Sequence, residues 1–361
     1  MICLDYRQYV FDGGDSLAES APMLIYRNTK KAALATVAFS GLTKLMQLRE
    51  LPHASVLLFH RFFENSPSRQ AGIDELRRRL EWLASVYTPI SLDEFERGLS
   101  TSTLVDRSVL VTIDDAHRDI IDAAEVFQEF GIPITIFVCA GWAASASKGD
   151  GSDLLARTCS MIEWYSGEDF EISLRNRSYL FAEKTKAQNI ENIARTGSLS
   201  VSEMIDICEQ IDRRNTGQSS ECCTWSELSQ LASAKVAMGA HSVTHINLAA
   251  ASPWRRKFEI AESRRVLASF FGDCSAFAYS FGTDDAHNPE TKRYLSECGY
   301  SSAFLTHSGF VTPLSDSFLY PRIALPDEPM SDREFRARVL GAGVFFRSMG
   351  EMLRKFTPGR R

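Results

Sequence analysis

The stretch Ser108-Val-Leu-Val-Thr-Ile-Asp-Asp-Ala-His117 decides the fold of this chain. From Val109 to Ile113 it is apolar or β-branched without polar alternation, which is typical of a strand covered on both faces. The strand ends on two adjacent carboxylates, Asp114 and Asp115. Two neighbouring negative charges at the end of a buried strand are costly to desolvate, so a positive partner such as a divalent cation is expected. If Asp115 instead capped the following helix, only one of the two carboxylates would be explained.

Outward from this stretch, strand-like and helix-like segments alternate. The helices between the strands have clear boundaries, such as Ser252-Pro253 before one helix and Gly272 after it. This alternation predicts a parallel sheet, and the number of strands favours a distorted (β/α) barrel of about seven parallel strands over an open sheet. The predicted strands are 55–59, 109–113, 133–138, 235–240, 276–281, 300–306 and 319–325.

Polar side chains fall at the carboxyl ends of several predicted strands. They are His60, Asp114, Asp115, His241 and His307. Barrels of this type carry their chemistry at that end of the sheet. We therefore expect these five side chains to gather at one site.

A second motif, Gly239-Ala-His-Ser-Val-Thr-His245, follows another predicted strand. Its two histidines are four residues apart, a spacing that would place both imidazoles on one face of a helical turn. Together with a carboxylate, two imidazoles form a ligand set that leaves open positions on zinc or a similar divalent ion.

The rest of the chain divides into three additions to the barrel domain at 51–340. An N-terminal helical arm is predicted, and its apolar stretch 32–42 is too short to span a bilayer. We expect that arm to pack on the main domain, with peripheral membrane association as the alternative. A mostly helical insertion with one β-hairpin is predicted to lie on the surface without a core of its own, as decoration or as a lid over the substrate. These three segments are 1–50 for the arm, about 145–224 for the insertion and 341–361 for a C-terminal tail.

Composition limits the function classes and the compartment. The chain has 361 residues and a net charge of −6, which gives no indication of nucleic-acid binding. Its eight cysteines show no CxxC pair, and Cys222 adjoins Cys223, which suits no ordinary disulfide framework. A reducing compartment, the cytoplasm, is therefore expected.

The motifs resemble those of the polysaccharide deacetylases, the NodB-homology fold of carbohydrate esterase family 4. Thr112-Ile-Asp-Asp-Ala116 is similar to Thr-Phe-Asp-Asp-Gly, and His241-Ser-Val-Thr-His245 matches His-Ser/Thr-x-x-His. Phe277-Ala-Tyr-Ser-Phe-Gly282 resembles Phe-Ala-Tyr-Pro-Phe/Tyr-Gly. The resemblance covers about 55–325 and implies a distorted (β/α) barrel that removes acetyl groups from carbohydrate with the help of a metal ion. Ala116 stands in place of the family's glycine, and Ser280 in place of its proline.

The resemblance also implies roles for individual residues. Asp115, His241 and His245 would bind the metal, most simply zinc, and Asp114 would be the general base that takes a proton from the attacking water. A divalent cation lowers the pKa of water from about 15.7 towards roughly 7, which makes such a base effective.

Two histidines are candidates for the general acid. Phe59-His-Arg61 resembles the segment that precedes the Asp-Asp motif in the poly-N-acetylglucosamine deacetylases, which would make His60 the acid. Leu305-Thr-His307 resembles the late Leu-x-His pattern of other members and is the alternative. The expected substrate is an acetylated carbohydrate, with the N-acetyl group as the expected target. A related metal hydrolase for a small amide or an O-acetyl ester, and a sugar-binding relative without catalysis, are the competing functions.

Overall fold

A computed structural model describes residues 53–147, 154–163, 169–174, 177–196, 199–214, 221–233, 235–345 and 347. The predicted N-terminal arm (1–50) and most of the C-terminal tail (341–361) lie outside these described residues. Among the described residues, no helix combines the length and the apolar run that crossing a bilayer requires.

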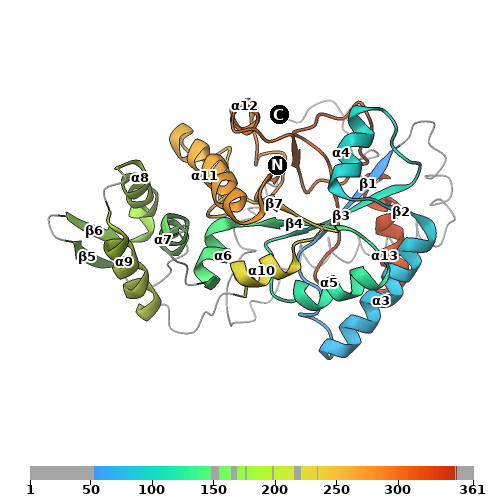
Figure 1. The fold of residues 1–361 in the computed structure, drawn as a ribbon, viewed down its shortest axis with the longest axis horizontal. Coiled ribbons are helices and arrows are strands. Elements are labelled where there is room, and N and C mark those ends of the chain that lie inside the picture. Colours follow the sequence, from blue (N-terminus) through green and yellow to red (C-terminus); the bar gives the residue numbers. More distant parts are fainter. Residues whose placement is uncertain are drawn as a thin grey trace, which may run out of the picture.

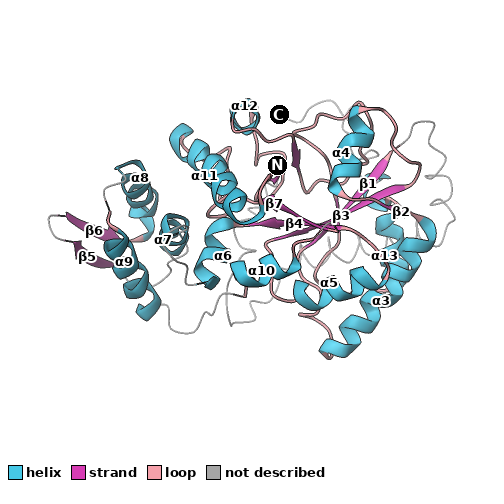
Figure 2. Ribbon diagram, in the orientation of Figure 1, coloured by secondary structure: helices cyan, strands magenta, loops and turns pink. Residues whose placement is uncertain are grey.

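One sheet of parallel strands forms the centre of the molecule, with helices around it (Figure 1 and Figure 2). Seven strands follow one another in the order β10-β1-β3-β4-β7-β8-β9, and β2 pairs with β3 as an eighth. The predicted distorted (β/α) barrel of about seven parallel strands is therefore confirmed. The strands are β1 (Ala54–Phe59), β2 (Thr88–Pro89), β3 (Ser108–Asp114), β4 (Ile134–Val138), β7 (Val236–Ala240), β8 (Ala276–Ala278), β9 (Ser302–Phe304) and β10 (Ile323–Ala324).

The segment 317–325 links the two edges of this sheet. Tyr320 N donates to Ala303 O at 2.9 Å beside β9, whereas Leu325 N donates to Leu58 O at 2.9 Å beside β1. The chain thus passes from one edge strand to the other, and Arg322 lies between the two contacts. This passage brings a fully buried arginine into the barrel, where it pairs with Asp114.

The helices cover the outside of the sheet, as Figure 2 shows. Their ends carry the expected caps: Ser252 and Asn288 accept hydrogen bonds from the first turns of α11 and α12, each of which begins with proline. The helices are α3 (Arg69–Val86), α4 (Leu92–Ser100), α5 (Ile120–Glu129), α6 (Ala140–Ser147), α10 (Trp225–Leu231), α11 (Pro253–Phe271), α12 (Pro289–Glu297) and α13 (Asp332–Val339).

Side chains of β3 alternate between two apolar clusters. Val109, Val111 and Ile113 pack outwards with residues of α3 and α5, whereas Leu110 packs inwards with Phe137 and Phe304. Because successive strand side chains point to opposite faces, Asp114 shares the inner face with Leu110. The register of the strand therefore sends the first carboxylate into the barrel.

The insertion forms a separate lobe beside α6 and α11, at the left of Figure 1. It has a hydrophobic cluster of its own, which includes Ile162, Ile172, Ile193 and Ile207, all nearly inaccessible to solvent. The prediction that it has no core of its own is therefore wrong, because apolar residues spread over several short elements converge only after folding. Its elements are α7 (Leu154–Glu163), a hairpin of β5 (Phe170–Leu174) and β6 (Arg177–Phe181), a short 3₁₀ turn (Glu183–Thr185), α8 (Lys186–Thr196) and α9 (Val201–Arg214).

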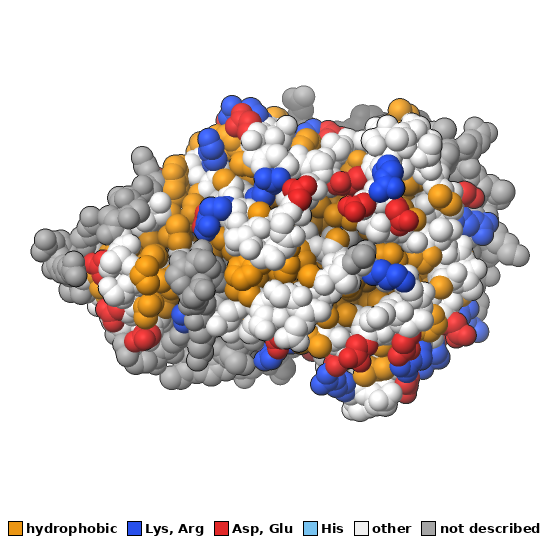
Figure 3. Space-filling model, viewed as in Figure 1, with side chains coloured by type: hydrophobic (Ala, Val, Ile, Leu, Met, Phe, Trp, Pro, Cys, Tyr) orange, Lys and Arg blue, Asp and Glu red, His pale blue; other side chains and the backbone are white. Residues whose placement is uncertain are grey.

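The molecular surface is chemically mixed. On the face shown in Figure 3, basic and acidic side chains are interspersed with apolar ones. The described side chains of this face thus form no patch of a single charge sign that would steer a strongly charged polymer.

Candidate active site

Asp114 is held by a bidentate ion pair at the end of β3. Arg322 Nη1 donates to Asp114 Oδ1 and Nη2 to Oδ2, each at 2.7 Å, and both side chains are almost completely buried. Arg322 Nε donates to Leu305 O at 2.8 Å, so the guanidinium is fixed on both sides. Burial opposes ionisation of Asp114, but the charges of Arg322 and His241 outweigh it and hold the pKa of this carboxyl below its usual value.

Asp115 leaves the strand direction and turns towards the histidines. Asp115 and Ala116 have φ values of 69° and 55°, in the left-handed region that favours glycine. The family's glycine matches this conformation, and here Ala116 adopts it with a Cβ. Asp115 does not cap α5, which begins at Ile120 with Asp119 as its N-cap residue.

The two histidines of the second motif lie on a loop and not on a helical turn. His241 follows β7 directly, and Ser242 and His245 have φ values of 63° and 56°. The expected helical turn is therefore wrong, although the loop still brings the two imidazoles together, with ring centroids 4.9 Å apart. His241 Nδ1 lies 2.8 Å from Ala278 O, which directs Nε2 towards Asp115.

Asp115, His241 and His245 surround one point. Nε2 of each histidine lies 3.5 Å from Asp115 Oδ1, and the three ligand atoms all lie within 4.8 Å of one another. Ligand atoms on one tetrahedral zinc are about 3.3 Å apart, given bond lengths of about 2.0–2.1 Å. Asp115 Oδ1 is buried, yet it has no hydrogen-bond partner among the described residues. These three residues therefore fit a divalent cation.

The protonation states also suit a cation. Burial lowers the pKa of His245 to about 4, although Asp115 opposes this shift. Burial raises the pKa of Asp115, but the neighbouring His245 and His241 outweigh it, so the net pKa lies below the usual value. At neutral pH His245 thus offers a lone pair and Asp115 a negative charge, as metal ligands must.

The two candidate acids have different side-chain neighbours. His60 follows β1, whose Phe59 is paired with Ile113 of β3, so His60 lies beside the carboxylate pair. Its charge contributes to lowering the pKa of both Asp114 and Asp115, after the larger effects already given. His307 Nδ1 instead lies 3.3 Å from Asp284 Oδ1, on the loop that follows β8. The carbonyl of His307 also accepts a hydrogen bond from Arg322 N at 3.1 Å, so the backbone of His307 lies next to the arginine that holds Asp114.

Three residues at this site had no role in the sequence prediction. Trp142 of α6 stacks on His245, with centroids 4.8 Å apart and planes 26° apart. His117 is buried, with Nε2 3.8 Å from Asp115 Oδ2. In the sequence, Arg322 stands out only as part of the Pro321-Arg322 pair in the last predicted strand. Nothing in local sequence marks Trp142, because its contact depends on how α6 packs against the histidine loop.

Ser280, which stands where the family has proline, contacts the same loop. Its hydroxyl lies 3.0 Å from Ser242 Oγ, and Ser242 Oγ accepts from His245 N at 3.0 Å. A hydrogen-bonded pair of hydroxyls thus supports the loop at the position where the family motif has the rigid ring of proline.

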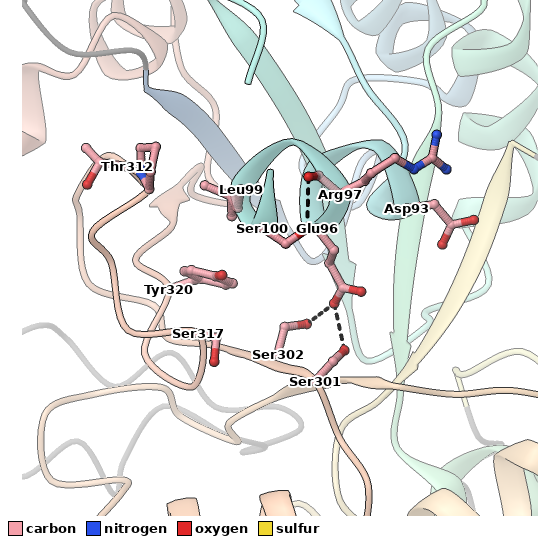
Figure 4. A pocket seen from close by; sticks show the side chains of 11 residues that line it. Asp93, Glu96, Arg97, Leu99, Ser100, Ser301, Ser302, Thr312, Ser317 and Tyr320 are labelled. Atoms are coloured by element: carbon pink, nitrogen blue, oxygen red, sulfur yellow. Dashed lines mark hydrogen bonds between the residues drawn. The ribbon is translucent and has the colours of Figure 1, made fainter. Parts of the chain in front are cut away.

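A cavity of about 610 Å³ lies elsewhere, between α4 and the start of β9 (Figure 4). Its main acidic group, Glu96, accepts hydrogen bonds from Ser301 and Ser302, at 3.0 and 2.5 Å. Ser302 begins β9, so this cavity faces the amino ends of the strands. The carboxylate pair and the two histidines of the second motif lie at the opposite ends of the strands.

Solved structures of low sequence identity share this fold. A deacetylase of Streptococcus pyogenes, PplD, in complex with acetate, aligns with a TM-score of 0.52 and 17% identity over 80% of this chain and 99% of that chain. IcaB from Ammonifex degensii aligns with a TM-score of 0.51 and 17% identity over 80% and 97%. A de-N-acetylase from Aggregatibacter actinomycetemcomitans gives 0.50 and 11% over 79% and 99%. A search of curated proteins finds no match.

The sequence itself shows the family. The sequence model described as polysaccharide deacetylase matches residues 101–303, more than half of the chain. This chain belongs to the polysaccharide deacetylase family. It is a hydrolase that deacetylates polysaccharide, and its substrate is an acetylated carbohydrate.

Proposed function

We propose that this chain is a zinc-dependent deacetylase that removes N-acetyl groups from a polysaccharide or oligosaccharide by attack of water. The observation that carries this proposal is the triangle of Asp115, His241 and His245 beside the arginine-clamped Asp114. The three residues of the triangle would hold the ion. A bound divalent ion supplies Lewis acidity, which activates water and polarises the acetyl carbonyl.

Asp114 is the proposed general base. Its Oδ2 lies 3.9 Å from His241 Nε2, so the carboxylate borders the ligand triangle. Arg322 keeps it ionised, and each carboxylate oxygen retains a further lone pair for a proton from the attacking water. Addition of water to the acetyl carbon and cleavage of the carbon–nitrogen bond then yield acetate and a free amine.

His60 is the proposed general acid. It lies on the β1 side of the carboxylate pair, across from His241 on the β7 side. From there it donates a proton to the departing nitrogen. A general acid must carry a proton when it acts, so this role requires the protonated imidazole in the complex with substrate.

Acetate release tests the proposal. We expect release from N-acetylated glucosamine oligomers, its loss on treatment with a chelator, and its recovery when Zn²⁺ is added back. Release that persists with the metal removed would contradict the metal centre. A strong preference for O-acetyl esters or small amides would favour the related hydrolase. Because the ligand triangle, Asp114 and His60 are all present, catalysis is favoured over sugar binding alone.

We also propose a cytoplasmic location, from the cysteine spacing, which cell fractionation would test.

Separate substitution of the two candidate acids by alanine tests the assignment of His60 as the general acid. We expect His60→Ala to lower kcat by about 10²–10⁴ and to change the alkaline side of the pH profile, with metal retained. His307→Ala, which removes a contact to Asp284, is expected to cost much less. Steady-state kinetics from pH 5 to 10 with metal analysis would measure both variants. The opposite order of the two effects would assign the acid to His307.

A further inference from the structure

The loop that carries His245 has an unusual backbone. Ser242 and His245 both adopt positive φ values, which residues with a side chain rarely do, and which persist only when the surroundings hold them. On one side α6 holds the loop: Ala140 N donates to Ser242 O at 3.1 Å and Gly141 N to Val243 O at 2.9 Å. His245 is itself part of neither a helix nor a strand, so its position depends on the contacts that neighbouring elements make with the loop.

Glu259 of α11 holds the other side of the loop. Its Oε2 accepts hydrogen bonds from the successive amides of Val243 and Thr244, at 2.8 and 2.9 Å. Its Oε1 accepts from the Thr244 hydroxyl at 2.6 Å. Glu259 is 0% exposed, so these contacts form without competition from water. One buried carboxylate thus fixes the two residues that directly precede His245.

Arg255 connects this carboxylate to the insertion. Arg255 Nε donates to Glu259 Oε1 at 2.7 Å, and Nη2 donates to the Thr244 hydroxyl at 2.7 Å. The same Nη2 lies 3.2 Å from Oε2 of Glu163, the last residue of α7. The Glu163 side chain is 26% exposed, whereas that of Arg255 is 8% exposed. A planar guanidinium carries five donors in a rigid fork, so one side chain can bridge these acceptors.

We propose that Glu259 and the insertion residue Glu163, joined through Arg255, are positioning residues for the metal ligand His245. The insertion then supports the metal centre and is more than decoration or a lid. This inference rests on the proposed metal-dependent function. Outer contacts that orient a ligand commonly change metal affinity by about 10–100-fold when they are removed.

The test uses three single variants of the full chain. Glu259→Gln keeps the shape of the side chain and removes its charge, and Glu163→Gln does the same at the half-buried end of the network. Glu262→Gln on the same helix is the matched control, because Glu262 pairs only with the exposed Arg265 among the contacts described. Zn²⁺ affinity is measured by chelator competition, and amide hydrogen exchange of Val243 and Thr244 is measured in the metal-free protein.

We expect Glu259→Gln to weaken Zn²⁺ binding by about 10–100-fold and to speed exchange at Val243 and Thr244. Glu163→Gln should weaken Zn²⁺ binding and speed amide exchange by about tenfold or less. In the double variant of Glu163→Gln and Glu259→Gln, the change in the free energy of Zn²⁺ binding should differ from the sum of the two single changes. Glu262→Gln should change neither. If Glu259→Gln does not fold, Glu163→Gln carries the test.

Two outcomes would overturn the inference, and they can be told apart. Unchanged Zn²⁺ affinity and unchanged exchange in the variants, with normal Zn²⁺ binding by the unaltered protein, would reject the positioning role alone. Failure of the unaltered protein to bind Zn²⁺ would reject the proposed metal centre and this inference with it. A general loss of thermal stability with native Zn²⁺ affinity would identify a structural role only, and would also reject the inference.

Discussion

Replacement of His245 or His241 by alanine is expected to abolish metal binding and almost all activity. Each histidine offers one of the three ligand atoms of the proposed metal centre, and their Nε2 atoms lie 3.5 Å from Asp115 Oδ1. A Lewis acid contributes several kcal/mol of charge stabilisation in the transition state, and about 1.36 kcal/mol corresponds to a tenfold change in rate. We therefore expect kcat/KM to fall by about 10³-fold or more. Metal content per chain and acetate release would measure the two effects.

A third histidine provides the control. His53 directly precedes β1, at the amino end of the strand, and its ring contacts Phe310. His53→Ala should keep both metal and activity, and circular dichroism should show that all three variants fold. Full metal occupancy in both His241→Ala and His245→Ala would rule out the proposed site.

The second large effect is expected for Asp114→Asn. An amide cannot accept the proton from water, so kcat should fall by about 10²–10⁴. Metal should be retained, because Asp115 and the two histidines are unchanged. Asp273→Asn is a suitable control, since this carboxylate is 79% exposed and pairs with Arg264 at the surface. Near-native activity of Asp114→Asn would contradict its role as the base.

The same change should also lower stability. It leaves Arg322 fully buried without its counter-charge, and breaking a buried ion pair costs about 3–5 kcal/mol. The pKa of Asp114 is lowered in the folded protein, so its stabilising contribution is complete above the unfolded value of about 3.9. That contribution is lost as the pH falls through the lower folded pKa. Denaturant unfolding at pH 7 should therefore separate variant from wild type, and the difference should shrink in strong acid.

Much of the barrel is determined by the sequence alone. The unbroken apolar run of Val109–Ile113 could be stable only with both faces covered, which predicts a central parallel strand. Capping residues predicted the ends of helices such as α11, because Ser252, Pro253 and Gly272 act through contacts within a few residues. The carboxyl ends of parallel strands meet at one edge, so the sequence also predicted that five side chains would gather there: His60, Asp114, Asp115, His241 and His307.

Only the tertiary structure decided which of these groups face one another. Arg322 is separated by 208 residues from Asp114, and their pairing depends on the path of 317–325 between two edge strands. The histidine loop is another case: a spacing of four residues suits a helical turn, but Glu259 and α6 satisfy the loop amides and carbonyls in a different backbone conformation. The apolar cluster of the insertion and the link from Glu163 through Arg255 to the histidine loop also depend on contacts between distant segments. Short-range propensities determine the helices and strands, whereas contacts between distant segments depend on tertiary packing, which no local sequence pattern predicts.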